Sequence, residues 1–268
     1  MSAEKRFSFG KNWAYFLKGL NEERIVEAEK SLKKKLCLDT LENKVFLDVG
    51  CGSGLFSLAA HRLGARVISF DYDQESVACT QYLKDTYGKE APSWSVQQGS
   101  VLDKAFLASL DKADIVYSWG VLHHTGNMVD AFDNVFGLVK PHGKLFISIY
   151  NYQGKSSVLW HKIKKMYVSM PRMRGPLLAV CGLWLWKYRM AWDLIRYGNP
   201  FKYIMEYGKN NRGMSAWYDL IDWVGGYPFE VAKPEQVFTF FYNRGFKLEK
   251  MKTCAGGRGC NEFVFLKG

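Results

Sequence analysis

Four residues at every second position, Asp48, Gly50, Gly52 and Gly54, form the pattern with the clearest chemical meaning in this sequence. They follow on directly from a short apolar run at 45–47, which is typical of a buried strand. Glycine tolerates positive φ and lets a ligand approach the backbone closely. Because open α/β sheets bind ligands outside the carboxyl ends of their strands, we expect this loop to edge a nucleotide site.

The spacing of the glycines distinguishes between two kinds of nucleotide. A dinucleotide fingerprint, G-x-G-x-x-G, requires a third glycine where this chain has Leu55. The D-x-G-x-G-x-G pattern instead resembles the class I S-adenosylmethionine (SAM) methyltransferases. SAM carries no pyrophosphate, so its site does not need a helix N-terminus that cradles phosphates. The resemblance implies that the cofactor contacts Asp48, near its amino-acid end, and Gly50, Cys51, Gly52 and Gly54.

Further cofactor residues are expected where the following strands end. Asp71 ends the second apolar run, seventeen positions after Gly54, and its carboxylate can accept both ribose hydroxyls. The resemblance places Asp103 near the adenine amino group, and Asp103 also fits as the N-cap of a helix over 104–110. Trp119 follows the fourth strand, where it borders the cofactor or packs as a core aromatic. The other candidates flank these positions: Tyr72, Ser100 and Val101.

Two histidines, His123 and His124, follow the fourth expected strand. Methyl transfer is an in-line displacement whose thioether leaving group needs no acid, so the protein must aim the nucleophile and sometimes remove its proton. Imidazole suits proton removal near neutral pH. Ubiquinone-biosynthesis O-methyltransferases and related enzymes keep a histidine matching His124, and in many relatives it holds its loop by hydrogen bonds. Both histidines are therefore candidates for a catalytic base or for a structural role.

Strands and helices alternate along the chain, which predicts βαβ units and a parallel sheet. We expect strands at 45–48, 67–71, 94–96, 114–118 and 144–150, and helices at 53–63, 73–87 and about 128–139. A turn at 141–143 should lead into the fifth strand. Two more strands, at 246–251 and 262–266, complete the Rossmann-like, doubly wound, seven-stranded sheet that the resemblance implies, with its last strand antiparallel. The predicted fold class is α/β with a helical lid inserted after the fifth strand.

This pattern divides the chain into four parts. They are an N-terminal helical segment (1–44), a SAM-binding core (45–150), an insertion or lid (151–232) and a C-terminal completion of the core sheet (233–268). In the family, helices that precede the sheet often close over SAM. Lys11, Asn12 and Trp13 are therefore candidates for a contact with the cofactor.

The insertion is strongly basic. Residues 151–214 contain twelve Lys and Arg and two acidic residues, a difference of +10, against +11 for the whole chain. Its charges could attract an anionic acceptor, and its segment 176–197 could lie on a membrane surface, or the insertion could be a structural lid with a solvated basic face. The apolar run at 176–186 is too short to span a bilayer. Binding of RNA between basic and stacking aromatic residues is less expected, because no RNA-recognition module is visible.

The residues after the insertion point to the acceptor side of the site. Glycines and a proline among aromatic and acidic residues over 211–230 predict a shaped loop rather than a helix. The passage D-W-x-G-G-Y-P-F-E at 222–230 and the ending G-C-N-E-F-V-F at 259–265 are similar to those of bacterial quinol-methylase-like small-molecule methyltransferases. The resemblance covers nearly the whole chain but does not identify an acceptor. Candidate substrate-binding residues are Tyr150, Arg212, Asp222, Trp223 and Tyr227.

Composition limits the remaining choices. Apolar residues make up 48% of the chain, which excludes a disordered protein. The N-terminal residues lack the apolar stretch of a signal peptide, so a cytoplasmic location is expected. Six cysteines show no zinc-ligand spacing, and no metal site is expected.

The sequence thus predicts a SAM-dependent methyltransferase. We expect O-methylation of a small or carrier-linked anionic metabolite, with a carboxylate, phenol or sugar hydroxyl as nucleophile. One alternative is a tRNA methyltransferase that uses the basic insertion. Another is a protein of the same fold that does not transfer methyl groups, such as an aminopropyl transferase, although the acidic pocket needed for polyamines disagrees with the basic insertion.

Overall fold

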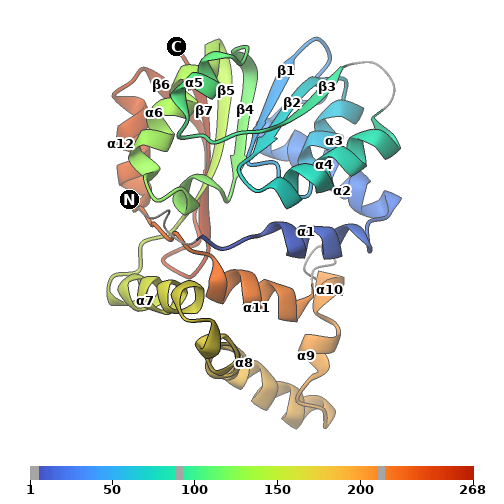
Figure 1. The fold of residues 1–268 in the computed structure, drawn as a ribbon, viewed down its shortest axis with the longest axis vertical. Coiled ribbons are helices and arrows are strands. Elements are labelled where there is room, and N and C mark those ends of the chain that lie inside the picture. The colour runs from blue at the N-terminus through green and yellow to red at the C-terminus, as the bar shows by residue number, and fades with distance from the viewer. Residues whose placement is uncertain (1–5, 89–92, 211–214) are drawn as a thin grey trace. The chain divides into compact units, whose positions relative to one another are not determined.

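The computed structural model describes residues 6–88, 93–210 and 215–268 (Figure 1). The chain divides into two compact units. The first, here called the core unit, consists of Phe9–Ser157 and Phe229–Gly268. The second, here called the insertion unit, consists of Val158–Pro228 and the described residues before Phe9.

The core unit is built on one seven-stranded sheet. Its strands are β1 (Val45–Val49), β2 (Arg66–Asp71), β3 (Trp94–Gln98), β4 (Ala113–Trp119), β5 (Val139–Tyr150), β6 (Phe246–Lys252) and β7 (Cys260–Lys267). They lie in the order β3-β2-β1-β4-β5-β7-β6, and β7 is antiparallel to both of its neighbours. The predicted Rossmann-like sheet with an antiparallel last strand is confirmed.

Helices cover both faces of this sheet (Figure 1). Those of the core unit are α1 (Gly10–Leu17), α2 (Glu22–Leu36), α3 (Leu55–Arg62), α4 (Gln74–Tyr87), α5 (Lys104–Ala108), the 3₁₀ turn η1 (Leu122–His124), α6 (Met128–Leu138) and α12 (Pro234–Tyr242). Successive strand residues face opposite sides, so Leu47 joins the core with α5, α6 and α12, whereas Phe46 joins the core with α2, α3 and α4. The near-continuous apolar β1 is explained by burial on both faces.

The insertion unit is helical. It contains most of α7 (Lys155–Ser169), then η2 (Pro171–Met173), α8 (Arg174–Tyr197), α9 (Lys202–Met205), α10 (Tyr207–Asn210) and α11 (Ala216–Gly225). One face of α8 packs on α11: a Cβ added to Gly182 would lie 3.1 Å from Leu220. Among the described residues, no helix combines the length and the apolar character needed to cross a bilayer.

The expectation of a shaped loop without helix over 211–230 is wrong for its middle part. Residues 216–225 form helix α11, in which Ala216, Leu220 and Val224 recur every four positions and are buried. The glycines and the proline lie at the end of this helix, where Gly226 is its C-cap. They end a helix and do not prevent one. Residues 211–214 lie outside the described part of the chain.

Two other boundaries differ from the prediction. The helix after the glycine loop begins at Leu55, because Gly54 has a φ of +80°, which a right-handed helix excludes. Strand β5 begins at Val139, and the turn expected at 141–143 is an irregularity within the strand, where the register with β4 shifts.

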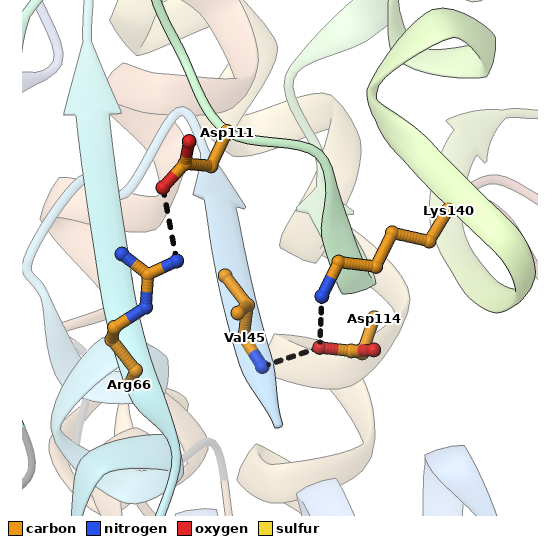
Figure 2. Close-up of polar contacts among 5 residues, drawn as sticks. All are labelled: Val45, Arg66, Asp111, Asp114 and Lys140. Carbon is orange, nitrogen blue, oxygen red and sulfur yellow. Dashed lines mark hydrogen bonds and ion pairs between the residues drawn. The ribbon is translucent and has the colours of Figure 1, made fainter. Parts of the chain in front are cut away.

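The amino-terminal edge of the sheet is held by one carboxylate (Figure 2). Asp114 at the start of β4 accepts the backbone N–H of Val45 at 2.8 Å and the ammonium of Lys140 at 2.9 Å, so it joins β1, β4 and β5. Burial raises the pKa of Asp114, but these two interactions outweigh it and hold the pKa below its usual value. Arg66 and Asp111 form a more exposed ion pair nearby, at 3.0 Å.

Asp114 should therefore stabilise the fold more than its neighbour Asp111 does. We expect Asp114→Ala to lower the free energy of unfolding by about 1–2 kcal/mol, because it removes the acceptor of Val45 and the partner of Lys140. Asp111→Ala is the matched control and should cost no more than about 0.5 kcal/mol, as exposed ion pairs contribute little. Urea unfolding followed by circular dichroism measures both, and equal losses would contradict this role for Asp114.

Candidate functional site

The glycine loop between β1 and α3 is closely packed on two sides. Gly50 and Gly52 have φ angles of +77° and +55°, which other residues rarely adopt. A Cβ added to Gly50 would lie 2.4 Å from Val121, and one added to Gly52 would lie 3.0 Å from the indole nitrogen of Trp13. The positive φ angles favour glycine at both positions, as the sequence pattern predicted, and the contact with Val121 also leaves no space for a Cβ at Gly50.

Asp71, the last residue of β2, is fixed beside this loop. One carboxylate oxygen accepts the N–H of Gly52 at 3.0 Å, and the other accepts the N–H of Asp73 at 2.9 Å. Burial raises the pKa of Asp71 to about 6, although these hydrogen bonds act in the opposite direction. The backbone N–H of Tyr72 also donates to this carboxylate. A carboxylate has about four lone-pair positions, so Asp71 keeps about one for a ligand.

Asp48 faces the interior of the sheet. Its carboxylate accepts a hydrogen bond from the hydroxyl of Ser57 on α3 at 2.6 Å, and Ser57 contacts the hydroxyl of Ser69 at 2.7 Å. Trp94 donates from its indole N–H to Ser69 at 2.9 Å, and all four side chains are buried. Burial raises the pKa of Asp48 to about 7; the hydrogen bond from Ser57 opposes the rise and nearby Asp71 adds to it. In this structure Asp48 joins α3 to the sheet, and its contact with a cofactor stays a prediction.

The candidates that follow β2 and β3 have different environments. Asp103 accepts the N–H groups of Ala105 and Phe106 as the N-cap of α5, which is the capping role that the sequence allowed. Tyr72 is exposed, and Ser100 accepts the N–H of Leu102. The side chain of Val101 packs into the core with α5 and α6. Cys51, in the glycine loop, is buried against Thr80, and burial raises the pKa of its thiol.

Trp119 lies on the α2 side of the sheet. Its indole N–H donates to Glu262 of β7 at 3.2 Å, and the ammonium of Lys35 lies 5.5 Å from its ring centroid. Lys35 and Glu262 form an ion pair at 3.1 Å. Burial raises the pKa of Glu262, but the charge of Lys35 and the hydrogen bonds from Lys35 and Trp119 outweigh burial and lower this pKa. The sequence prediction missed Lys35 and Glu262 as partners of Trp119, although Glu262 belongs to the G-C-N-E-F-V-F ending.

The two histidines have different surroundings. His123 is fully buried; its Nδ1 accepts the backbone N–H of Tyr150 at 3.3 Å and its carbonyl accepts the N–H of Glu230 at 2.9 Å. These contacts join the turn after β4 to the end of β5, which is a structural role. His124 is half-buried, with its ring centroid 5.1 Å from that of Phe9 and 5.4 Å from that of Tyr150. His124 is thus the more accessible imidazole.

Aromatic rings surround the end of β5. Tyr150 lies 4.0 Å from His123 and 5.4 Å from Phe229, measured between ring centroids. Glu230, next along the chain, accepts the N–H of Met128 at the start of α6 at 3.1 Å. Phe229 and Glu230 were not predicted as site residues, although both belong to the D-W-x-G-G-Y-P-F-E passage.

The other substrate-binding candidates belong to the insertion unit. The ammonium of Lys164 donates to the carbonyl of Trp223 and lies 4.7 Å from its ring centroid. Burial lowers the pKa of Lys164 to about 7, and Asp222 opposes this shift. Tyr227 is buried, with its ring 5.6 Å from His161. Asp222 and Trp223 thus surround a buried lysine that the sequence did not single out, while Arg212 lies outside the described residues.

Helix α1 covers the glycine loop within the core unit. Trp13 contacts Gly52, and the N–H of Gly10 donates to Asp73 at 3.0 Å. Asn12 is buried and Lys11 is exposed. Of the three N-terminal candidates, Trp13 is the one that lies at the loop.

The family model described as a methyltransferase domain matches residues 20–201, which is more than half of the chain. The chain belongs to this family. The resemblance to class I methyltransferases that the glycine pattern indicated is therefore confirmed.

Curated relatives of this methyltransferase domain are similar over part of their length. The chain is 27% identical over 116 residues to the ubiquinone biosynthesis O-methyltransferase of Parvibaculum lavamentivorans, which covers 41% of this chain and 42% of the relative. It is 31% identical over 119 residues to the tRNA U34 carboxymethyltransferase of Saccharophagus degradans, covering 44% and 36%. The chain thus spans less than half the length of either relative. The names of these two relatives refer to different pathways and acceptors, ubiquinone biosynthesis and tRNA, so the similarity does not identify an acceptor for this chain.

A solved structure extends the comparison to the whole fold. Magnesium protoporphyrin IX methyltransferase from Synechocystis PCC 6803, crystallised with bound SAH, aligns with a TM-score of 0.56 over 96% of this chain and 94% of that one. Sequence identity is 14%, so the likeness concerns the fold alone.

The buried carboxyls predict a pH dependence for the stability of this methyltransferase domain. A carboxyl with a raised folded pKa binds more protons when folded than when unfolded, so stability falls as the pH rises from about 4 to about 7. We expect Asp48→Asn to flatten this fall, because the amide still accepts from Ser57 but does not titrate. Urea unfolding at intervals of about one pH unit measures the slope. Asp111→Asn is the surface control. If the free energy of unfolding fell with pH as steeply in Asp48→Asn as in this control, Asp48 would not have a raised pKa in the folded protein.

Proposed function

We propose that this protein is a SAM-dependent methyltransferase that methylates an oxygen of a small or carrier-linked anionic metabolite. The observation that carries the proposal is the fixed carboxylate of Asp71 beside a loop in which Gly50 and Gly52 have positive φ angles and are closely packed. This arrangement offers a cradle of backbone at the ends of β1 and β2 and a hydrogen-bond acceptor beside it.

The residues present fit SAM. Asp71 keeps acceptor capacity for a ribose hydroxyl beyond the three backbone N–H groups that hold it, and Tyr72 is exposed next to it. The glycine loop is the proposed contact of the methionine portion, with Asp48 behind the loop. SAM, when bound, supplies an electrophilic methyl group on a positively charged sulfonium. Ionised carboxylates nearby favour that charge, so SAM binding should lower the raised pKa values of Asp48 and Asp71.

The end of β5 supports the acceptor side of the proposal. Phe9, His124 and Tyr150 are half-buried aromatic rings there, with Phe229 buried against Tyr150, and such rings suit a planar or apolar acceptor. His124, half-buried among these rings, is placed to take a proton from an acceptor hydroxyl. His123 positions the turn that carries His124, through its contacts with Tyr150 and Glu230.

The insertion supports an anionic acceptor through its charge. Residues 151–214 of the insertion carry twelve basic residues against two acidic ones, which raises the local concentration of anions. Asp222, Trp223, Tyr227 and Arg212 stay as proposed acceptor-side residues, although Asp222 and Trp223 also serve to surround Lys164. The O-methylation itself is proposed from the similarity to ubiquinone biosynthesis O-methyltransferases.

Asp71→Ala tests the cofactor site. We expect it to weaken binding of S-adenosylhomocysteine by about 10- to 100-fold, because charge-assisted hydrogen bonds to the ribose are lost. Isothermal titration calorimetry measures the affinity, and Asp111→Ala is the surface control. If Asp71→Ala bound the product as tightly as the control does, the carboxylate would not contact the ribose.

His124→Ala tests the proposed base. Methyl-labelled SAM and a cell extract identify the acceptor, and mass analysis of the product identifies the methylated atom. With that acceptor, we expect turnover to fall by about 100-fold or more while product affinity is unchanged, because general-base catalysis contributes on this scale. His142→Ala, an exposed histidine in β5, is the matched control.

The same assay separates the alternatives. Unchanged turnover in both His123→Ala and His124→Ala would remove base catalysis by histidine. Labelling of tRNA, with binding that weakens steeply as salt rises, would replace the metabolite with RNA as the acceptor. Absence of any labelled acceptor would favour a protein that binds SAM without transferring its methyl group.

A further inference from the structure

Helix α8 carries an apolar stripe that faces solvent. Val180, Leu183, Leu194 and Ile195 expose 67%, 63%, 53% and 83% of their surface. They recur at positions i, i+3, i+14 and i+15, so they lie along one side of a helix over about 22 Å. Soluble proteins rarely leave such a stripe uncovered unless it is an interaction site.

Buried residues near the amino-terminal end of α8 hold this helix in the insertion unit. Leu177, Leu178 and Cys181 are buried, and Gly182 packs against Leu220 of α11. The helix therefore already has a packed apolar face within the insertion unit. The exposed stripe consists of further apolar residues of α8, which the packing of α8 on α11 does not bury.

Aromatic and basic residues border the stripe. Trp184 packs on one side against Trp160 and is otherwise exposed. Lys187 lies in the middle of the stripe, and the guanidinium of Arg196 lies 6.0 Å from the ring of Trp192. Tryptophan and basic residues beside aliphatic ones are typical of helices that lie at the interface between lipid headgroups and acyl chains.

The acidic side chain of α8, Asp193, is paired with a basic residue of the same helix. Asp193 is the one acidic residue between 174 and 197, and it is buried. Its carboxylate pairs with Arg189 at 3.2 Å and accepts the N–H of Tyr203 at 2.8 Å. The helix therefore presents an unopposed positive charge beside the apolar stripe.

From these observations we propose that α8 binds the surface of an anionic lipid bilayer, lying parallel to it with the stripe inserted among the lipids. A second copy of the chain would bring two strongly basic insertions together, which like-charge repulsion opposes. RNA would use the basic residues but would leave the aliphatic stripe exposed. An anionic bilayer matches both properties, and the proposal does not depend on methyl transfer.

Flotation with vesicles tests the proposal on the full chain. We expect binding to vesicles of phosphatidylcholine containing about one third phosphatidylglycerol, much weaker binding to phosphatidylcholine alone, and loss of binding as salt rises. Leu183→Gln with Ile195→Gln should weaken binding about tenfold or more, because the inserted side chains are lost. Lys187→Gln should weaken it about fivefold.

Matched controls separate this surface from general effects. Tyr82→Gln removes an exposed apolar residue of α4, and Lys247→Gln removes an exposed charge of β6; both should bind vesicles as the unmodified chain does. An unchanged affinity for S-adenosylhomocysteine and an unchanged midpoint of thermal unfolding show that each variant is folded. Vesicle binding needs neither SAM nor an acceptor, so its outcome is independent of the proposed reaction.

Three results would overturn the proposal. The first is no flotation with anionic vesicles at low salt. The second is flotation that Leu183→Gln with Ile195→Gln leaves unchanged. The third is a dimer in sedimentation velocity that these substitutions abolish, without vesicle binding, which would show that a second copy covers the stripe.

Discussion

The structure of the core unit depends on the close approach of backbone to side chains in the glycine loop. Val121 packs against Gly50, Trp13 against Gly52 and Thr80 against Gly54, so three other segments meet the loop where a Cβ would clash. The loop is thereby held at the ends of β1 and β2. The N–H of Gly52 donates to Asp71, and the N–H groups of Gly50 and Cys51 donate to the carbonyl of Phe70, so the loop is fixed at this edge of the site.

The same region buries two carboxyl groups, and burial disfavours the charged form of each. Asp48 and Asp71 both lie close to the loop, and burial raises the pKa of each. Ser57 and Ser69 extend the hydrogen bonds of Asp48 to Trp94, so the charge is satisfied inside the sheet. Buried carboxyl groups with raised pKa values occur often at functional sites. It is consistent with a site prepared for a positively charged ligand.

Local pattern predicted the core unit well because its elements are strongly periodic. The alternation of strands and helices, Asp71 at the end of β2 and Asp103 as the N-cap of α5 could all be read from the chain. Prediction failed over α11, where the buried spacing of Ala216, Leu220 and Val224 was hidden by aromatic residues and by glycines that end the helix. A turn residue after a helix and a turn residue within a loop look alike until packing distinguishes them.

The sequence by itself determined the fold class and the candidate cofactor loop, because both follow from short-range spacing and from the conformational freedom of glycine. Only the tertiary structure decided which partners the site residues have. It buried His123 under Tyr150, paired Trp119 with Glu262, placed Asp222 and Trp223 around Lys164, and left the stripe of α8 in solvent. These contacts join residues that are far apart in the chain, or depend on which face of a helix is covered. Spacing along the sequence does not contain that information.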